Sequence, residues 1–376
     1  MTDRIGVGVI GTGFMGRCHA LAWRAVRAIF DDVPRPELIA ICDVVPEAAG
    51  VAADTFGFGH AAADWHELVA DPAIAVISIT TPNALHREMA VAALAAGKHV
   101  WCEKPMALTL ADAEAMAEAA RTAAGRTILG YNYARNPLIN EAQRLIADGA
   151  IGRVFHVRGI VDEDYSADPD LPWSWRLTRD QAGLGALGDL GCHLIAMLQV
   201  LVGPITQVQG DCAVVHADRP IPDRPGKRGI VDNEDLGQAL VHFANGASGV
   251  IAASRVAWGR KNRIAWEVHG SKGTLCFDQE RMNELALFTA DGPAAGRGFR
   301  TILAGPQHPP FGRFCPAPGH GLGFNDLKVI EAATLLQAIR TGSRAVLDFE
   351  DGLHVERTIH AIARAGEAAA WVRIRP

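Results

Sequence analysis

An uncharged apolar run that leads directly into a Gly-x-Gly-x-x-Gly sequence, residues 5–16, constrains the fold of this chain more than any other stretch. In a strand–turn–helix unit the first glycine permits the tight turn, the second lets the backbone approach a pyrophosphate, and the third lets the helix pack against the strand. The N–H groups of the helix start then face the anion. We expect the dinucleotide contacts to come from Gly11, Gly13, Phe14, Met15 and Gly16. An ordinary glycine-rich strand–helix turn is the alternative.

Asp43 ends the second expected strand, residues 37–43. An acid at this position accepts hydrogen bonds from the adenosine ribose hydroxyls and repels a 2′-phosphate. Val44 and Val45 follow it, so no arginine stands there to receive a phosphate. The sequence therefore favours NAD over NADP. The alternative is that Asp43 merely caps the strand end.

The length and composition limit the classes of protein to which this chain can belong. With 376 residues the chain is too long for one compact core and suits roughly two domains. The net charge of −6 is mild and no basic cluster occurs, so nucleic acid is not an expected partner. The longest apolar runs have strand length and residues 1–4 leave no room for a signal peptide, so we expect neither a membrane span nor secretion. The seven scattered cysteines indicate reduced thiols of a cytoplasmic protein and no metal site.

Two loops that follow buried strands carry further polar residues. Residues 73–80 lead into Thr-Pro-Asn-x-x-His, and residues 99–102 lead into Glu-Lys-Pro. Strand–turn–helix repeats of this regularity indicate right-handed βαβ units and a parallel sheet, whose ligand crevice is lined by loops at the carboxyl ends of the strands. The residues expected on the nicotinamide side are Thr81, Pro82, Asn83 and His86. A plain strand–helix loop that Asn83 caps is the alternative.

The glycine-rich turn, Thr-Pro-Asn-x-x-His and Glu-Lys-Pro, in this order, resemble the Gfo/Idh/MocA family, which is named after glucose–fructose oxidoreductase and inositol dehydrogenase. The similarity covers the whole chain. It implies an NAD-binding Rossmann domain over residues 1–132 and a substrate-binding and oligomerisation domain over residues 133–376. It also adds Glu103, Lys104 and Asn132 to the residues expected near the cofactor.

Beyond residue 152 the pattern changes to turn-bounded strands that mostly lack intervening helices. This pattern predicts an α+β domain with a large, mostly antiparallel open sheet. One face of such a sheet must be covered by helices or by another subunit. Family members typically use the sheet for oligomer contacts, so the resemblance implies a homo-oligomer, either a dimer or a tetramer.

A glycine-rich stretch, residues 183–193, carries Asp189 and His193 four positions apart, which places both on one face of a helix. Oxidation of an alcohol by NAD needs a base for the hydroxyl proton, and imidazole titrates in a suitable pH range. The resemblance implies that Asp189 and His193 are catalytic together with Lys104, whose ammonium would stabilise the developing alkoxide. Without the resemblance, a solvated or structural helix pair is the more ordinary interpretation.

Two segments bear on the substrate. We expect Arg176 to bind substrate hydroxyls and Trp173 or Trp175 to stack on a sugar face, although two tryptophans in a domain interface are the alternative. The Gly/Pro/His-rich loop over residues 305–323 resembles a subgroup that contains scyllo-inositol and levoglucosan dehydrogenases, and this implies a substrate contact from His320. A structural loop histidine is the competing interpretation. The expected substrate-binding residues are Lys104, Arg176, Asp189, His193 and His320.

Together these features predict a cytoplasmic NAD-dependent dehydrogenase that oxidises a secondary ring hydroxyl of an inositol-type cyclitol or a sugar to a ketone. The nearest enzymatic alternative acts on a pyranose ring hydroxyl, such as the 3-hydroxyl of levoglucosan or of an aminosugar glycoside. A non-catalytic NAD-binding regulator and a structural oligomer are the alternatives from other classes. The retained Lys104, Asp189 and His193 argue against the first, and the intact glycine-rich loop argues against the second.

Overall fold

The computed structural model describes residues 4–375 and divides into two compact units. Unit 1 comprises Met1–Arg135 and Leu322–Leu353, and unit 2 comprises Asn136–Gly321 and His354–Pro376. The boundary predicted at residues 132 and 133 gives every later helix to the second domain, whereas α10 (Phe324–Thr341) belongs to unit 1. The reason is that α10 packs against α1 (Phe14–Ile29) and the 3-10 helix η2 (Asn132–Arg135).

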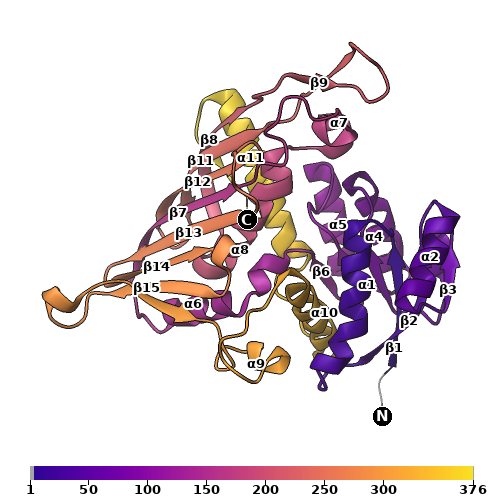
Figure 1. Ribbon diagram of the computed structural model, residues 1–376, viewed down its shortest axis with the longest axis horizontal. Helices are drawn as coiled ribbons and strands as arrows, with labels where there is room; N and C mark the ends of the chain where they lie inside the picture. Colours follow the sequence, from indigo (N-terminus) through magenta and orange to yellow (C-terminus); the bar gives the residue numbers. More distant parts are fainter. Residues whose placement is uncertain (1–3, 376) are drawn as a thin grey trace. The chain divides into compact units, whose positions relative to one another are not determined.

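Unit 1 is built on a six-stranded parallel sheet with the order β3-β2-β1-β4-β5-β6. Figure 1 labels β1, β2, β3 and β6 of this sheet. The order reverses at β1, and ligand crevices form at such a switch point, outside the carboxyl ends of the strands. The strands are β1 (Arg4–Ile10), β2 (Arg35–Cys42), β3 (His60–Ala62), β4 (Val76–Ile79), β5 (His99–Cys102) and β6 (Thr127–Leu129). The remaining helices are α2 (Pro46–Phe56), α3 (Trp65–Ala70), η1 (Asn83–Leu85), α4 (His86–Ala95) and α5 (Leu110–Thr122). The predicted Rossmann fold is confirmed.

Unit 2 is built on a nine-stranded sheet with the order β16-β15-β14-β13-β7-β12-β11-β8-β17. Only the β7–β12 pair among these described strands runs parallel, so the predicted mostly antiparallel sheet is confirmed. The strands are β7 (Val154–Asp162), β8 (Ile205–Ala213), β11 (Leu236–Phe243), β12 (Ser248–Ser254), β13 (Arg263–Gly270), β14 (Gly273–Asp278), β15 (Glu284–Thr289), β16 (Arg300–Leu303) and β17 (Val372–Arg373). A separate hairpin pairs β9 (Asp218–Pro220) with β10 (Arg228–Ile230).

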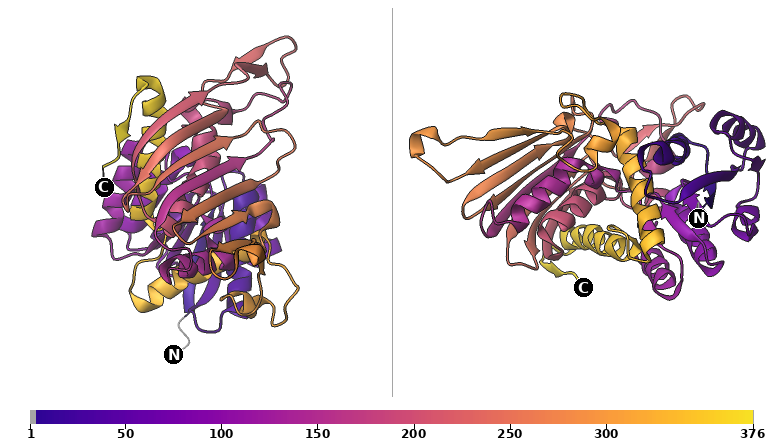
Figure 2. Two further views of the ribbon diagram at one scale, coloured as in Figure 1. Left: turned by 90° about the vertical axis from the view of Figure 1, so that its left-hand side faces the viewer. Right: turned by 90° about the horizontal axis from the view of Figure 1, so that it is seen from below.

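Helices lie along one face of the nine-stranded sheet, as Figure 2 shows for α6 (Pro137–Ala147), α8 (Cys192–Val202) and α11 (Phe349–Ala368). Buried and exposed residues alternate along β11 and β12, as expected when one face packs on a core. The opposite face carries exposed apolar side chains, including Leu240 and Val250. The shorter helices of this unit are η3 (Trp175–Leu177), α7 (Arg179–Ala182), η5 (Gln279–Arg281), η6 (Ala294–Gly296) and α9 (Phe311–Phe314).

One helical segment, Arg179–Val202, is long enough and on average apolar enough to cross a membrane. Its uninterrupted apolar runs are nevertheless no longer than a strand. Of its most apolar window, 78% is buried within the protein, and α8 packs against β7. The core helix of a globular domain satisfies the same length and composition test, so this segment belongs to the core of unit 2.

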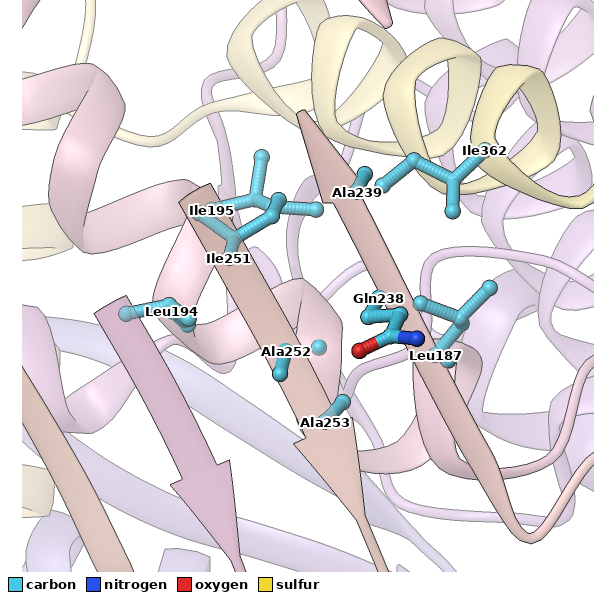
Figure 3. A pocket seen from close by; sticks show the side chains of 11 residues that line it. Leu187, Leu194, Ile195, Gln238, Ala239, Ile251, Ala252, Ala253 and Ile362 are labelled. Carbon is cyan, nitrogen blue, oxygen red and sulfur yellow. The ribbon is translucent and has the colours of Figure 1, made fainter. Parts of the chain in front are cut away.

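A small apolar cavity lies between α8, α11 and strands β11 and β12 (Figure 3). Leu187, Ile195 and Ile362 line it from the helices, and Ile251 lines it from the sheet. Gln238 is the one polar side chain among the described residues of this lining. A sugar needs several polar groups to orient its hydroxyls. We therefore assign the cavity to core packing.

Candidate active site

The glycine-rich turn joins β1 to α1 in unit 1. Gly11 has a φ of +100°, and a Cβ on Gly16 would lie 2.0 Å from the Gly11 carbonyl oxygen, so both positions require glycine. By contrast, no described heavy atom comes within 4 Å of the position that a Cβ on Gly13 would take. Open space beside the backbone at the start of a helix is what a bound pyrophosphate needs. Phe14 is 71% exposed at this helix start and stacks on Phe324.

The Asp43 carboxylate is held in place before any ligand binds. Its Oδ2 accepts hydrogen bonds from the Thr12 backbone N–H at 2.9 Å and from the Thr12 hydroxyl at 2.6 Å, and its Oδ1 accepts one from Val45 N–H at 3.1 Å. Partial burial would raise the pKa of Asp43, but these hydrogen bonds outweigh it and hold the pKa below its ordinary value. The group is therefore a fixed anion, which suits ribose hydroxyls and disfavours a 2′-phosphate.

The residues of the loop after β4 that are expected on the nicotinamide side differ in how deeply they are buried. Thr81 is half-buried and Pro82 is exposed, whereas Asn83 begins η1 and is buried. His86 is 1% exposed, and its ring nitrogens lie 2.9 Å from the Thr81 carbonyl oxygen and 3.0 Å from the Pro105 carbonyl oxygen. Burial lowers the pKa of His86, so a neutral ring donates to one of these carbonyls. His86 thus links the loop after β4 to the loop that carries Lys104.

The Glu-Lys-Pro segment follows β5 directly. Glu103 is 4% exposed and contacts the side chains of His19 and Lys328, while Lys104 is half-buried. Asn132 begins η2 and is 2% exposed. Its Nδ2 finds no hydrogen-bond acceptor among the residues that the structure describes, and buried donors of this kind normally have a partner. The space at Gly13, the fixed Asp43 carboxylate and this unpaired donor all fit a bound NAD.

In unit 2, Asp189 lies in a π-helical turn, Leu187–Gly191, that continues into α8. His193 is the second residue of α8 and is 6% exposed. The π turn departs from the regular α-helix that the four-residue spacing predicts, and such turns are frequent at functional sites. Glu234 holds its start, because its Oε1 accepts a hydrogen bond from Leu187 N–H at 3.0 Å.

Tyr165 is a partner of Asp189 that local sequence patterns do not reveal. Its hydroxyl donates a hydrogen bond of 2.8 Å to Asp189 Oδ2. Partial burial and the Asp189 charge raise the pKa of Tyr165, so the phenol keeps its proton and remains a donor. Tyr165 is still 43% exposed, so it fixes the carboxylate without covering it completely.

The residues expected to recognise the substrate are placed unevenly within unit 2. Arg176 is exposed in η3 and stacks over the Trp175 ring at 4.6 Å from its centroid. Trp173 instead donates a hydrogen bond to the Ile230 carbonyl oxygen at 2.9 Å and packs against the β9–β10 hairpin, which favours a structural role. His320 is exposed in its loop, whereas His308 is buried and accepts a hydrogen bond from Gly305 N–H at 3.2 Å.

Comparison with known proteins decides the family. Residues 5–131 match the family described as "Oxidoreductase family, NAD-binding Rossmann fold", and residues 139–276 match "GFO/IDH/MocA C-terminal domain". The chain is 39% identical to levoglucosan dehydrogenase of Pseudarthrobacter phenanthrenivorans over 99% of this chain and 98% of that protein. The chain belongs to the Gfo/Idh/MocA family.

Two further similarities extend this assignment. A solved structure of levoglucosan dehydrogenase in complex with NADH and levoglucosan superposes with a TM-score of 0.95 at 39% identity, covering 99% of both chains. Myo-inositol 2-dehydrogenase of Thermotoga maritima is 28% identical over 92% of this chain and 91% of that protein. This Gfo/Idh/MocA protein is an NAD-dependent oxidoreductase of the sugar and cyclitol class that acts on CH–OH groups. The preference for NAD and the predicted family membership are thereby confirmed.

The predicted catalytic residues of this Gfo/Idh/MocA protein divide between the units, since Lys104 belongs to unit 1 and Asp189 and His193 to unit 2. Patterns in the sequence missed Thr12, Tyr165 and Lys328. Thr12 stands inside the glycine-rich turn and hydrogen-bonds Asp43, so its place in that motif was a usable signal. Tyr165 and Lys328 reach their partners across 24 and 225 positions, and no local pattern marks such contacts.

Proposed function

We propose that this protein oxidises a secondary ring hydroxyl of a levoglucosan-type pyranose, such as the 3-hydroxyl, to a ketone with NAD as hydride acceptor. The observation that carries the proposal is the full-length 39% match to levoglucosan dehydrogenase, against 28% for the inositol dehydrogenase. The comparisons therefore favour the pyranose alternative over the inositol-type substrate expected first. The inositol substrate is the second candidate, because the match to that enzyme also spans most of both chains.

The residue roles follow from the chemistry. His193 takes the hydroxyl proton on a ring nitrogen as general base, and Asp189 orients the imidazole and a substrate hydroxyl. Tyr165 holds Asp189 by its hydrogen bond, so one carboxylate oxygen keeps a fixed direction. Lys104 hydrogen-bonds the reacting oxygen and stabilises its developing negative charge. NAD, held by the glycine-rich turn, Asp43 and Asn132, supplies the hydride acceptor.

Substrate recognition would come from Arg176 with Trp175, and from His320. The Arg176–Trp175 stack presents five guanidinium donors beside an aromatic ring, a combination suited to a polyhydroxylated ring. We also propose that the protein works in the cytoplasm, where its seven free cysteines stay reduced, and that the open sheet face joins copies into a dimer or tetramer. Light scattering on the purified protein tests the assembly.

A substrate panel tests the proposed reaction. Levoglucosan, related anhydrosugars, aldoses, and myo- and scyllo-inositol are each offered with NAD and with NADP, and formation of NADH or NADPH is followed by absorbance. The proposal expects the highest kcat/KM for a levoglucosan-type pyranose with NAD. Turnover of the inositols alone would move the substrate to the second candidate. Tight NAD binding by calorimetry without turnover of any compound would favour a regulatory protein.

A further inference from the structure

A cluster of buried charges lies directly behind the Glu-Lys-Pro segment in unit 1. It comprises Glu103, Lys328, Glu331 and Arg135, together with His19, and each of these side chains is at most 7% exposed. Formally, two cations face two anions. We call these five residues the buried charge cluster.

Glu103 is the centre of the buried charge cluster. Its Oε1 accepts hydrogen bonds from the Lys328 ammonium and from His19 Nε2, the latter at 2.8 Å. Its Oε2 lies 3.3 Å from the backbone nitrogen of Lys104 and accepts that N–H. The position opposite is Gly130, where any Cβ would lie within 2.6 Å of the Glu103 carboxylate. The chain therefore leaves a fitted space for this carboxylate and uses both of its oxygens.

Lys328 is held as tightly on its other side. Its ammonium also contacts Glu331 Oε2 at 2.8 Å, and it lies 5.5 Å from the centroid of the Trp101 ring. The Trp101 indole N–H in turn donates to Glu331 Oε2 at 3.2 Å. Because Lys328 and Glu331 stand on α10 and Trp101 on β5, these contacts fix the end of β5 against the helix.

Stability alone gives no reason for such a cluster. Removing charges from water is costly, and well-packed apolar residues in place of a buried ion pair are often neutral or stabilising. Burial would raise the pKa of Glu103, but Lys328 and the His19 hydrogen bond hold that pKa well below its usual range, so the carboxylate stays charged. Because the Glu103 carboxylate is charged and has fixed partners, it holds the groups that hydrogen-bond to it in a fixed orientation. One of these groups is the backbone N–H of Lys104.

We propose that Lys328 is a positioning residue for Lys104, acting through the Glu103 carboxylate. The proposal rests on the proposed function, in which Lys104 stabilises the reacting oxygen. The Lys328 ammonium holds Glu103 Oε1, and Glu103 Oε2 then fixes the backbone N–H of Lys104. The Lys104 ammonium thereby keeps the direction that the reaction requires. A displacement of a catalytic group by about 1 Å can cost about 100-fold in rate, so this anchoring is worth a buried charge.

The test compares Lys328→Met with Lys98→Met. Lys98 is also buried in unit 1, where its ammonium bonds the Asp71 and Ile74 carbonyl oxygens, but it precedes β5 and so lies at the end of the sheet away from the crevice. We expect Lys328→Met to lower kcat by about tenfold or more while the NADH dissociation constant stays within about twofold. Lys98→Met should lower the melting temperature and leave both quantities unchanged.

A second readout does not depend on turnover. Acylation of Lys104 by a small amine-reactive reagent, followed by peptide mass spectrometry, should become about threefold faster or more in Lys328→Met because the segment is released. Wild-type kcat and acylation rate in a folded Lys328→Met protein would overturn the proposal. If Lys104→Met kept wild-type turnover, the proposed catalytic role would fail, yet the acylation rates would still decide the positioning.

A charge-balanced variant covers the case in which Lys328→Met does not fold. Lys328→Met combined with Glu103→Gln removes one charge of each sign and keeps the side-chain shapes close to the originals. We expect this double variant to fold and to show the low kcat and the faster acylation of Lys104. A double variant with wild-type values of both would equally contradict the proposal.

Discussion

The two units place their functional residues in different ways. In unit 1 the glycine-rich turn, Asp43 and Lys104 each stand where a parallel strand ends, so the order of residues along the chain already brings them to one edge of the sheet. In unit 2 the direction of Asp189 depends on Tyr165, which follows β7, and on Glu234, which precedes β11. Under the proposed function, cofactor binding is thus specified locally, whereas substrate handling depends on contacts between distant segments.

The largest expected effect concerns His193, the general base proposed in unit 2. His193→Ala should lower kcat by about 100- to 10,000-fold, because a positioned general base contributes about that much. Its NADH dissociation constant, measured by fluorescence, should stay within about twofold. His60→Ala, an exposed histidine on β3 in unit 1, is the control and should behave as wild type. Turnover at the wild-type rate in His193→Ala would exclude His193 as the general base.

The acid sensitivity of the two units offers a second comparison. Burial lowers the pKa of His19 in unit 1 from 6.5 to about 4, and burial, aided by Arg364 and Arg179, does the same for His360 in unit 2. Between pH 6.5 and about 4, each of these histidines is protonated in the unfolded chain but not in the folded protein. The free energy of unfolding should therefore fall as the pH decreases through this window, by at most about 3 kcal/mol for each histidine.

Urea unfolding of His19→Gln and His360→Gln measures each contribution separately. Each variant should lose less stability than wild type between about pH 7 and about pH 4.5. If both variants kept the full wild-type pH dependence, the buried histidines would not be its source.

Asp43→Ser tests how locally the cofactor preference is specified. If Asp43 accepts hydrogen bonds from the ribose hydroxyls as proposed, its loss should raise KM for NAD by about 10- to 100-fold and reduce the advantage over NADP, since hydrogen bonds to charged groups are worth about 1.5–3 kcal/mol. Thr12→Val, which removes only the hydroxyl that holds Asp43, should show a smaller effect in the same direction. An unchanged NAD to NADP ratio in Asp43→Ser would place the selectivity elsewhere.

Tyr165→Phe gives the smallest expected change and tests the non-local contact in unit 2. Loss of the hydrogen bond to Asp189 should lower kcat/KM by about fivefold to tenfold, because water can replace part of this half-exposed contact. NADH binding and the melting temperature should remain close to wild type. A wild-type kcat/KM would show that Asp189 needs no support from Tyr165.

The sequence alone predicts most of unit 1, because the Rossmann motif is contiguous and each of its residues answers a local requirement. It also predicts the mostly antiparallel sheet of unit 2 from the spacing of strands and turns. The membership of α10 in unit 1 could not be predicted, since an apolar helix face does not say which sheet it will cover. The π turn at Asp189 was hidden for a related reason, because its residues also fit regular α-helical spacing.

The site shows the same division. Asp43 and Lys104 follow from their places at strand ends, but whether a residue meets the ligand or supports another residue depends on tertiary packing. His86 illustrates this, since its motif suggested a cofactor contact and the structure buries it between two backbone carbonyls. Trp173 is a second example, because its indole N–H supports the β9–β10 hairpin.

The central claim is that unit 1 holds the hydride acceptor for a carbinol of a levoglucosan-type pyranose. Levoglucosan that carries deuterium at its C3 carbinol carbon tests it most directly, with the nicotinamide product and the sugar product both analysed by mass spectrometry. We expect singly deuterated NADH together with the 3-keto sugar. Unlabelled NADH, or no oxidation of levoglucosan under conditions in which an inositol is turned over, would contradict the account.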